Sequence, residues 1–196
     1  MVLKKDDGWI EPRLMVGHEA DELRDQDFLN FYRGEIARYE PRKSFLDSFT
    51  YQFADNLFIF EGTPEIAEIP LLRGLIFWVL TEHLGVSTEV SSDLILAFEE
   101  AIANVVRHSY SQKDIKWLRT RIYRDNELII EIHDRGEVTH GDEFSKILEK
   151  ITKEGRPPLK KRGGLGLYLM KRIMDELTYQ SNEINILRMI KKIRNS

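Results

Sequence analysis

The chain has 196 residues, enough for one large domain or for one domain with an appendage. Its 42% hydrophobic content is ordinary for a globular protein, and its formal net charge of -4 gives no general attraction to nucleic acid or to anionic lipid. The absence of cysteine excludes a disulfide framework, thiol chemistry and a zinc-finger site. No apolar run suits a bilayer span or a signal peptide, so we expect a cytoplasmic protein.

The first 54 residues differ in pattern from the rest of the chain. Apolar and aromatic side chains recur every three to five residues over 19–39, which predicts an amphipathic helix that ends before Pro41. A second aromatic-rich stretch covers 45–53. We expect residues 1–54 to form an N-terminal helical extension packed on a main domain. The alternative is a surface for self-association or for a partner, because exposed aromatic faces seldom stay solvated.

The following residues predict a strand and two helices. Residues 57–60 are a short apolar run that is typical of a strand. Pro70 suits the first position of a helix that ends at about Leu84, because Gly85 follows as a stop. Capping residues come next, and they introduce a longer helix that reaches about His108.

Two strand patterns, residues 116–124 and 127–133, come next in the chain. They are joined at Asp125-Asn126, which suits a tight hairpin turn. Residues 137–162 are polar and interrupted by glycine and proline. This composition predicts a long, mobile loop with a short helix near 144–150.

The last predicted elements are a helix over 165–176 and a hairpin of two strands, 177–180 and 186–193. Residues 55–196 therefore predict an α+β domain, in which helices cover one face of a mainly antiparallel sheet. Such a domain is an α/β sandwich of two layers.

The longer helix carries two polar residues one turn apart, Glu100 and Asn104. Asn104 can offer a neutral oxygen to magnesium, and Glu100 can orient or deprotonate an attacking hydroxyl group. The alternative is a solvated helix face with a hydrogen bond between the two side chains. His108 continues this face, and we expect it to be a capping or packing group. An adjacent apolar stripe is made of Leu94, Phe98, Ala101, Ile102 and Val105.

Asp134 ends a strongly alternating strand. Its carboxylate can accept a hydrogen bond from an exocyclic amine such as that of adenine. Gly136 follows and lets the backbone come close to a flat ring. The alternative is an ordinary turn at the end of a strand, because Asp and Gly are common turn residues.

A glycine cluster opens the helix that follows the long loop. The backbone can approach phosphate oxygens closely at Gly163, Gly164 and Gly166, and its N–H groups can donate hydrogen bonds to them. The positive end of the helix dipole adds to the attraction. Arg162 precedes them and can meet a terminal phosphate. No Gly-Lys-Ser/Thr follows, which excludes a Walker A loop, and no strand of a βαβ unit leads in. The alternatives are a flexible loop that ends at a helix start, and a solvated charge run.

In this order, the three segments resemble the GHKL (Bergerat-fold) ATPase superfamily, and they are most similar to bacterial anti-sigma factor serine/threonine kinases. Glu100–Tyr110 resembles the N box, Asp134–Gly136 the G1 box, and Gly163–Met170 the G2 box. The likeness runs from about Leu57 to the C-terminus. It implies a Bergerat fold with ATP lying between the long helices and a mobile lid, residues 137–162.

The resemblance also implies a reaction, in which the γ-phosphoryl group of magnesium-ATP passes to a serine or threonine of a STAS-domain anti-anti-sigma protein. A sigma factor is the second implied partner, so that transcription is regulated by partner switching, with no direct contact to nucleic acid or membrane. Homodimers are common in the family. Glu100 would be the general base and Asn104 the magnesium ligand. The implied positions that bind ATP or ADP are Asn104, Asp134, Gly136, Arg162, Gly163, Gly164, Leu165, Gly166 and Leu167.

Two departures from the family pattern leave alternatives open. Val138 stands where broader superfamily members have a second glycine, and residues 1–54 have no counterpart in a minimal anti-sigma kinase. A non-catalytic, nucleotide-dependent switch that binds partners is therefore one alternative. A histidine-kinase-type ATPase domain is another, although His18 lies in no convincing phospho-accepting helix. The N-terminal region would cover the sigma-binding surface, form a dimer or sense another input.

Overall fold

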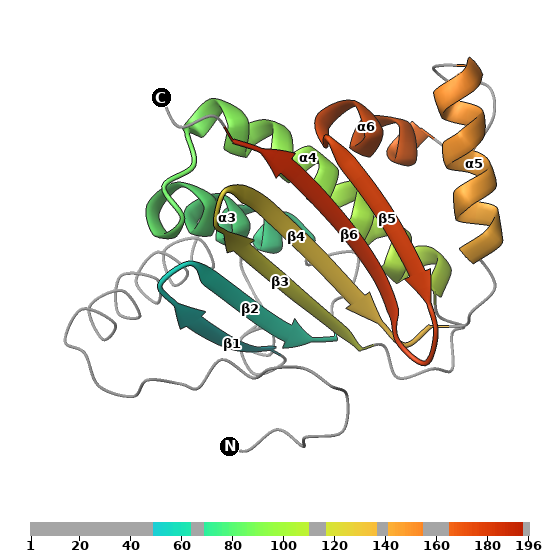
Figure 1. The fold of residues 1–196 in the computed structure, drawn as a ribbon. Coiled ribbons are helices and arrows are strands. Elements are labelled where there is room, and N and C mark those ends of the chain that lie inside the picture. The colour runs from blue at the N-terminus through green and yellow to red at the C-terminus, as the bar shows by residue number, and fades with distance from the viewer. Residues whose placement is uncertain (1–48, 64–68, 110–116, 137–140, 155–164, 194–196) are drawn as a thin grey trace.

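The computed structural model describes residues 49–63, 69–109, 117–136, 141–154 and 165–193. Their six strands form one sheet in the order β1-β2-β3-β4-β6-β5, and every neighbouring pair is antiparallel. The strands are β1 (Phe49–Ala54), β2 (Leu57–Gly62), β3 (Leu118–Arg124), β4 (Glu127–Asp134), β5 (Glu176–Ser181) and β6 (Asn185–Lys192). Figure 1 shows this sheet in front of the main helices.

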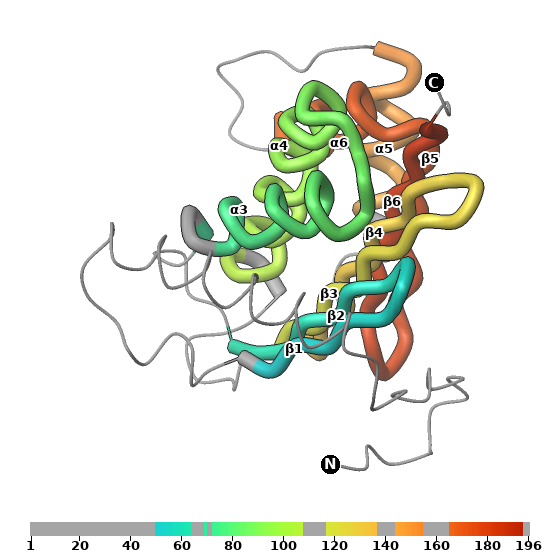
Figure 2. Tube along the Cα trace, turned by 90° about the vertical axis from the view of Figure 1, so that its left-hand side faces the viewer, coloured from blue at the N-terminus to red at the C-terminus, as the bar shows by residue number. Residues whose placement is uncertain are grey.

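The helices form the second layer. They are α3 (Ile69–Trp78), the π-helical turn η2 (Val79–His83), α4 (Thr88–Asn104), the π-helical turn η3 (Val105–Ser109), α5 (Gly141–Glu154) and α6 (Leu165–Ile173). Helices α3, α4 and α6 cover one face of the sheet, as Figure 2 shows from the side, and α5 stands beside the β5 edge. The predicted α+β fold, a two-layer sandwich, is confirmed. None of the described helices is both long and apolar enough to cross a membrane.

The register of the strands explains why the sheet buries one face. Ile130 of β4 lies opposite Ile122 of β3 and Met189 of β6, and Ile132 lies opposite Leu187. Residues that face each other across antiparallel strands point to the same side, so these side chains form one continuous apolar surface. All five are buried at 7% exposure or less. The alternation that was read from the sequence of β4 therefore corresponds to its buried face.

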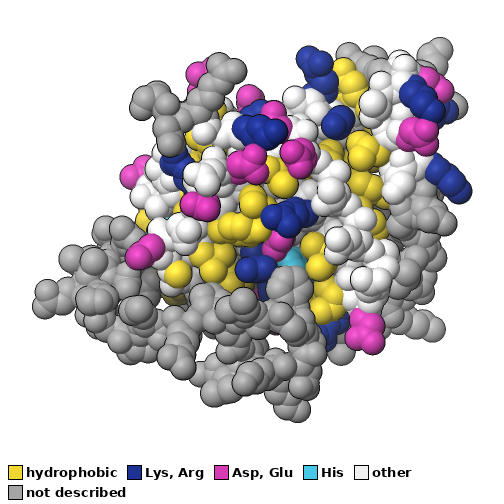
Figure 3. All heavy atoms as spheres, viewed as in Figure 1, with side chains coloured by type: hydrophobic (Ala, Val, Ile, Leu, Met, Phe, Trp, Pro, Cys, Tyr) yellow, Lys and Arg dark blue, Asp and Glu magenta, His cyan; other side chains and the backbone are white. Residues whose placement is uncertain are grey.

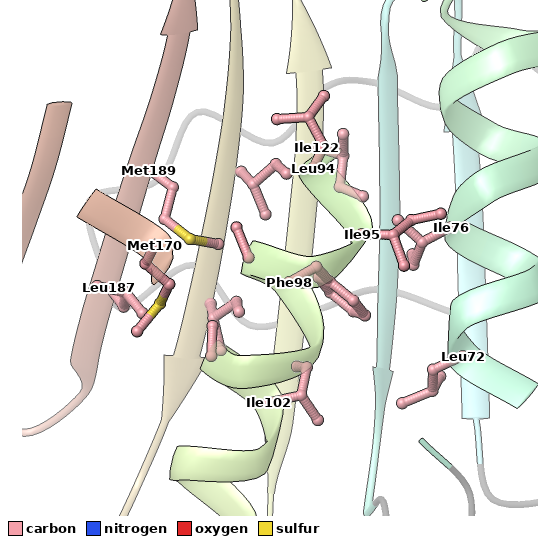
Figure 4. Packing of buried hydrophobic residues seen from close by; sticks show 14 of the residues in the cluster. Leu72, Ile76, Leu94, Ile95, Phe98, Ile102, Ile122, Met170, Leu187 and Met189 are labelled. Carbon is pink, nitrogen blue, oxygen red and sulfur yellow. The ribbon is translucent and has the colours of Figure 1, made fainter. Parts of the chain in front are cut away.

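Helix α4 supplies the central part of the core. It begins after Ser87, whose Oγ accepts a hydrogen bond from Val90 N at 3.4 Å. Figure 4 shows Leu94, Phe98 and Ile102 along α4 in front of the strands, with α3 on one side of α4 and Met170 of α6 on the other. The predicted apolar stripe of α4 is confirmed, because all five of its members are buried. The period of its apolar residues therefore orients α4 and leaves its polar residues on another face.

One part of the N-terminal prediction is wrong. Residues 49–54, which we expected in a helical extension, form strand β1 and pair with β2. The physical reason is the period of two in Phe49, Tyr51 and Phe53, which suits a strand. Phe53 packs on Phe58 with ring centroids 4.8 Å apart. The boundary expected after residue 54 falls within a hairpin, and the predicted helix over 19–39 lies outside the described residues.

Other element boundaries differ by smaller amounts. The helix expected from Pro70 to Leu84 is α3 followed by η2, and the short helix expected at 144–150 extends over all of α5. Helix α6 ends at Ile173, because the chain enters β5 only three residues later. The predicted strands and the hairpin turn at Asp125-Asn126 are confirmed within two residues.

Candidate functional site

Helices α4 and α6 bring two of the three predicted segments together. Glu100 lies on the face of α4 that turns toward α6, and its carboxylate lies directly over Gly166. A Cβ atom built on Gly166 would overlap Oε2 of Glu100 and would lie 3.2 Å from its Cδ. The buried Ala97 and Ala101 on α4 are small, which permits this close approach. The N-box segment and the start of the glycine-led helix therefore meet at one point.

Asn104 is the last residue of α4, one turn beyond Glu100, and it is partly exposed. Among the described residues, no group of three His, Cys, Asp or Glu side chains could hold a metal ion. Magnesium commonly binds through one or two protein oxygens and keeps several waters. A partly exposed amide side chain one helical turn from a carboxylate fits such a loosely held, hydrated ion. The chemistry of this donor pair is therefore compatible with magnesium.

Asp134 occupies the end of β4 and is 2% exposed. Its Oδ1 accepts hydrogen bonds from Gly136 N at 2.8 Å and from Asn185 Nδ2 at 3.0 Å. Asn185 lies directly opposite Asp134 in the β4–β6 register. Its amide also donates to Gly136 O at 3.2 Å, and its Oδ1 accepts from Ser181 Oγ at 2.7 Å. The buried carboxylate is thus held in one orientation.

Asn185 was missed by the sequence analysis. The signal that could have found it is its place in β6, where Leu187 and Met189 occupy the same face and are apolar. An amide at such an inward position needs buried partners. In this chain those partners are Asp134 and Gly136, so the G1-like segment depends on a residue from another strand.

A pair of aromatic rings lies beside this segment. Tyr179 of β5 stacks on Phe144 of α5 with ring centroids 5.0 Å apart. Burial, and after it the negative charge of Asp134, raises the pKa of the Tyr179 hydroxyl above its ordinary value. Tyr179 lies opposite Leu187 and Asp134 lies opposite Asn185 in the strand register, and Leu187 and Asn185 share one face of β6, so both groups lie on the same side of the sheet. The ring stack joins α5 to β5. The sequence analysis had not singled out either ring.

The glycine-rich segment is only partly described. Leu165 is 40% exposed at the start of α6, whereas Leu167 is buried. Arg162, Gly163, Gly164 and Val138 lie outside the described residues. The structure therefore brings Glu100 and Gly166 together and fixes Asp134 at the end of β4.

The opposite face of the sheet carries a separate charged cluster around Glu131. Arg121 Nη1 lies 2.9 Å from Glu131 Oε2, and the Tyr123 hydroxyl donates to Oε1 at 3.3 Å. Burial alone would raise the pKa of Glu131, but the hydrogen bond with His133 and the charge of Arg121 outweigh it and hold this pKa below its ordinary value. Burial, followed by the charge of Glu131, raises the pKa of Tyr123. This cluster stabilises the sheet away from the candidate site.

Comparison with known proteins identifies the family. The model of the histidine kinase-like ATPase domain matches residues 64–191. The chain belongs to this family. The match contains α4, β4 and α6, and hence every described residue of the candidate site. The sequence resemblance to GHKL ATPases is confirmed.

Several relatives of this ATPase family member are named serine-protein kinase RsbW. The protein from Halalkalibacterium halodurans is 32% identical over 114 residues, which cover 57% of this chain and 68% of that protein. The protein from Oceanobacillus iheyensis is 34% identical over 122 residues, covering 58% and 72%. The protein from Staphylococcus aureus is 26% identical over 132 residues, covering 66% and 83%. Within the family, this chain is therefore similar to serine-protein kinases.

A solved structure supports the same fold. A chain in the crystal structure of the SiaB–SiaC complex from Pseudomonas aeruginosa matches with a TM-score of 0.52 and 15% sequence identity. The match covers 78% of this chain and 95% of that chain. At this identity the likeness concerns the arrangement of helices and strands and carries no assignment of activity.

Proposed function

We propose that this chain is an anti-sigma factor serine/threonine protein kinase, which binds magnesium-ATP and phosphorylates a STAS-domain anti-anti-sigma partner. The observation that carries the proposal is the position of the Glu100 carboxylate against the first turn of α6. A base must lie where the phosphoryl group and the attacking hydroxyl meet, and the glycine-led helix start is the predicted phosphate-binding segment. The names of the relatives support a serine as the acceptor.

The adenine end of the proposed site is Asp134 with Gly136. The hydrogen bond from Asn185 and the bond from Gly136 N fix the carboxylate before any nucleotide arrives. A carboxylate that is already oriented can accept a hydrogen bond from the exocyclic amine of adenine without further ordering. The backbone at Gly136 would lie along the ring. We propose that this end supplies recognition of the base.

At the phosphate end, Asn104 would hold magnesium through its side-chain oxygen, and Arg162 with the backbone of 163–167 would bind phosphate oxygens. Magnesium, when bound, neutralises charge on the phosphate groups. Glu100 would accept the proton of the acceptor hydroxyl. The hydroxyl oxygen would bond to the γ-phosphorus as the bond from that phosphorus to ADP breaks. The catalytic work of the chain is then positioning and charge neutralisation.

The proposed function also defines partners and location. A sigma factor would bind the kinase when no STAS protein is bound to it. The unphosphorylated STAS protein would compete for the kinase and thereby release the sigma factor. ATP and sigma factors are cytoplasmic, so we propose that the chain acts in the cytoplasm. For a homodimer, we propose the sheet face that none of the described helices covers, where Figure 3 shows apolar, basic and acidic side chains side by side. Residues 1–48 would then act as an extension that modifies one of these contacts.

Two observations favour alternative functions. Val138 replaces a glycine of the broader superfamily, which favours a nucleotide-dependent switch that binds partners without phosphoryl transfer. The family model is named for histidine kinases, which would transfer phosphate to histidine. The three possibilities differ in the product, since phosphoserine and phosphothreonine are stable in acid, phosphohistidine is not, and a switch leaves the partner unmodified.

The test is incubation of the full chain and magnesium-ATP with each candidate STAS protein, followed by intact-mass measurement before and after acid treatment. We expect one acid-stable phosphate per partner molecule. Glu100→Gln should abolish this product while nucleotide affinity stays within a few-fold of the wild type, because the amide keeps the shape of the side chain but cannot take a proton. An unmodified partner in a stable complex would establish the switch, and an acid-labile phosphate would establish histidine chemistry.

A further inference from the structure

Gly166 is the second residue of helix α6, and the backbone conformation of α6 does not require a glycine there. Glycine is a poorer helix former than alanine, because it loses more conformational freedom. Among the described residues, Gly85 is the glycine whose φ is positive, at 62°, so Gly166 has no left-handed conformation to satisfy. The requirement for a glycine at this position therefore comes from its surroundings.

The three atoms nearest to a Cβ at this position all belong to Glu100. A Cβ on Gly166 would lie 3.5 Å from Glu100 Cβ, an ordinary van der Waals contact, and 3.2 Å from Cδ, which is tight. It would overlap Oε2 outright. The clash is thus confined to the far end of the Glu100 side chain. The contact at Glu100 Cβ is ordinary, so α4 and α6 need not move apart. An alanine at 166 would push the carboxylate aside without separating the helices.

We propose that Gly166 is a positioning residue for Glu100, because its missing side chain provides the space in which the carboxylate lies. This proposal rests on the proposed function of Glu100 as general base. It gives Gly166 a role different from that of a glycine that closes the backbone on phosphate. Direct contact between Gly166 and Glu100 would then fix the position of the base relative to the start of α6 before nucleotide binds.

The two roles predict different kinetics for Gly166→Ala. If the glycine positions Glu100, kcat falls and the dissociation constant for magnesium-ATP stays within about twofold, because the base is displaced while the phosphates are still bound. A misplacement of about 1 Å can lower a rate by about a hundredfold. If the glycine instead serves phosphate binding, the dissociation constant rises and kcat is preserved at saturating ATP. The second result would overturn the proposal.

A double-mutant cycle tests the contact without any kinase activity. In the full chain, thermal unfolding midpoints are measured for Gly166→Ala, Glu100→Ala and the double variant. In the Glu100→Ala background, where no carboxylate occupies the space, Gly166→Ala should raise the midpoint, since alanine favours the helix. In the wild-type background the same change should raise it less or lower it, because a carboxylate must move. The two changes are therefore non-additive.

Gly74→Ala is the matched control, because Gly74 is also a helical glycine but lies on α3. Its effect on the midpoint should be the same with Glu100 and with Ala at position 100. Additivity for the Gly166 cycle, equal to that of the control, would overturn the positioning role. Failure of the proposed function would show differently: no partner would be phosphorylated by the wild type, while the cycle at Gly166 would still be non-additive.

Discussion

Replacing Asn185 with alanine should destabilise the folded chain by about 2–4 kcal/mol, because a hydrogen bond to a buried charged group contributes roughly 1.5–3 kcal/mol and the remaining buried groups lose a partner. The Asn185 amide donates to Asp134 Oδ1 at 3.0 Å and to Gly136 O at 3.2 Å. Asp134 and Asn185 are 2% and 1% exposed, so the truncation leaves a carboxylate facing a small cavity. The variant should also bind ADP more weakly, since the adenine-side carboxylate loses its fixed orientation.

Urea denaturation followed by circular dichroism measures the stability, and calorimetry measures ADP affinity. The matched control is Asn182→Ala, because Asn182 is an exposed residue of the same β5–β6 turn. The control should change the free energy of unfolding by no more than about 0.5 kcal/mol, as expected for an exposed surface residue. Equal stability of the two variants would refute the reasoning that Asn185 supports Asp134.

Asn185→Asp provides a second arm of the same test. It places a carboxylate opposite Asp134, and two carboxylates that share a buried site cannot both ionise without cost. Its destabilisation at neutral pH should therefore exceed that of Asn185→Ala. The destabilisation should shrink as the pH falls, because one of the two carboxylates then takes up a proton. The protonated group can donate a hydrogen bond to the other carboxylate. A destabilisation that does not depend on pH would contradict this account.

Two further predictions concern groups outside the proposed chemistry. The folded-state pKa of Glu131 is lowered, so its contribution to stability is complete above its ordinary pKa of 4.5 and is lost as the pH falls through the lower folded-state value. Glu131→Gln should therefore reduce the free energy of unfolding by about 2 kcal/mol at pH 7, because the bond to Arg121 loses its charge, and the difference from the wild type should vanish in acid denaturation. A constant difference down to low pH would contradict this assignment. Phe144→Ala should release α5 from Tyr179 and speed amide exchange within α5 by about fivefold, because the ring pair contributes about 1 kcal/mol. Unchanged exchange would show that other contacts hold α5.

The sequence predicted the elements whose pattern has one clear period. Residues 128, 130 and 132 alternate with a period of two, and the stripe of α4 follows a helical period, so the strand and the apolar face of the helix were both predicted correctly. Strand β1 was mistaken because its aromatic residues follow a predicted amphipathic helix, and because a strand is stabilised by a partner that local pattern does not reveal. The pairing of Phe49–Ala54 with β2 decides its structure.

The candidate site was predicted where its residues are local motifs and was missed where it depends on packing. Glu100 and Asn104 were predicted from their spacing on one helix, and Asp134 from its position at the end of a strand. Asn185 was not found, because its role arises from the β4–β6 register. The contact between Glu100 and Gly166 also joins two helices, and a sequence pattern contains no distance between elements.

Calorimetry of ATP and ADP binding, with and without magnesium, tests most directly the claim that α4, β4 and the start of α6 form one nucleotide site. The wild-type chain should bind ATP with micromolar affinity in the presence of magnesium. Asn104→Ala should lose at least tenfold in affinity for magnesium-ATP and should bind metal-free ADP like the wild type, since only the ion's ligand is removed. No binding by the folded wild-type chain, or an Asn104→Ala variant that retains the full magnesium dependence, would contradict the account.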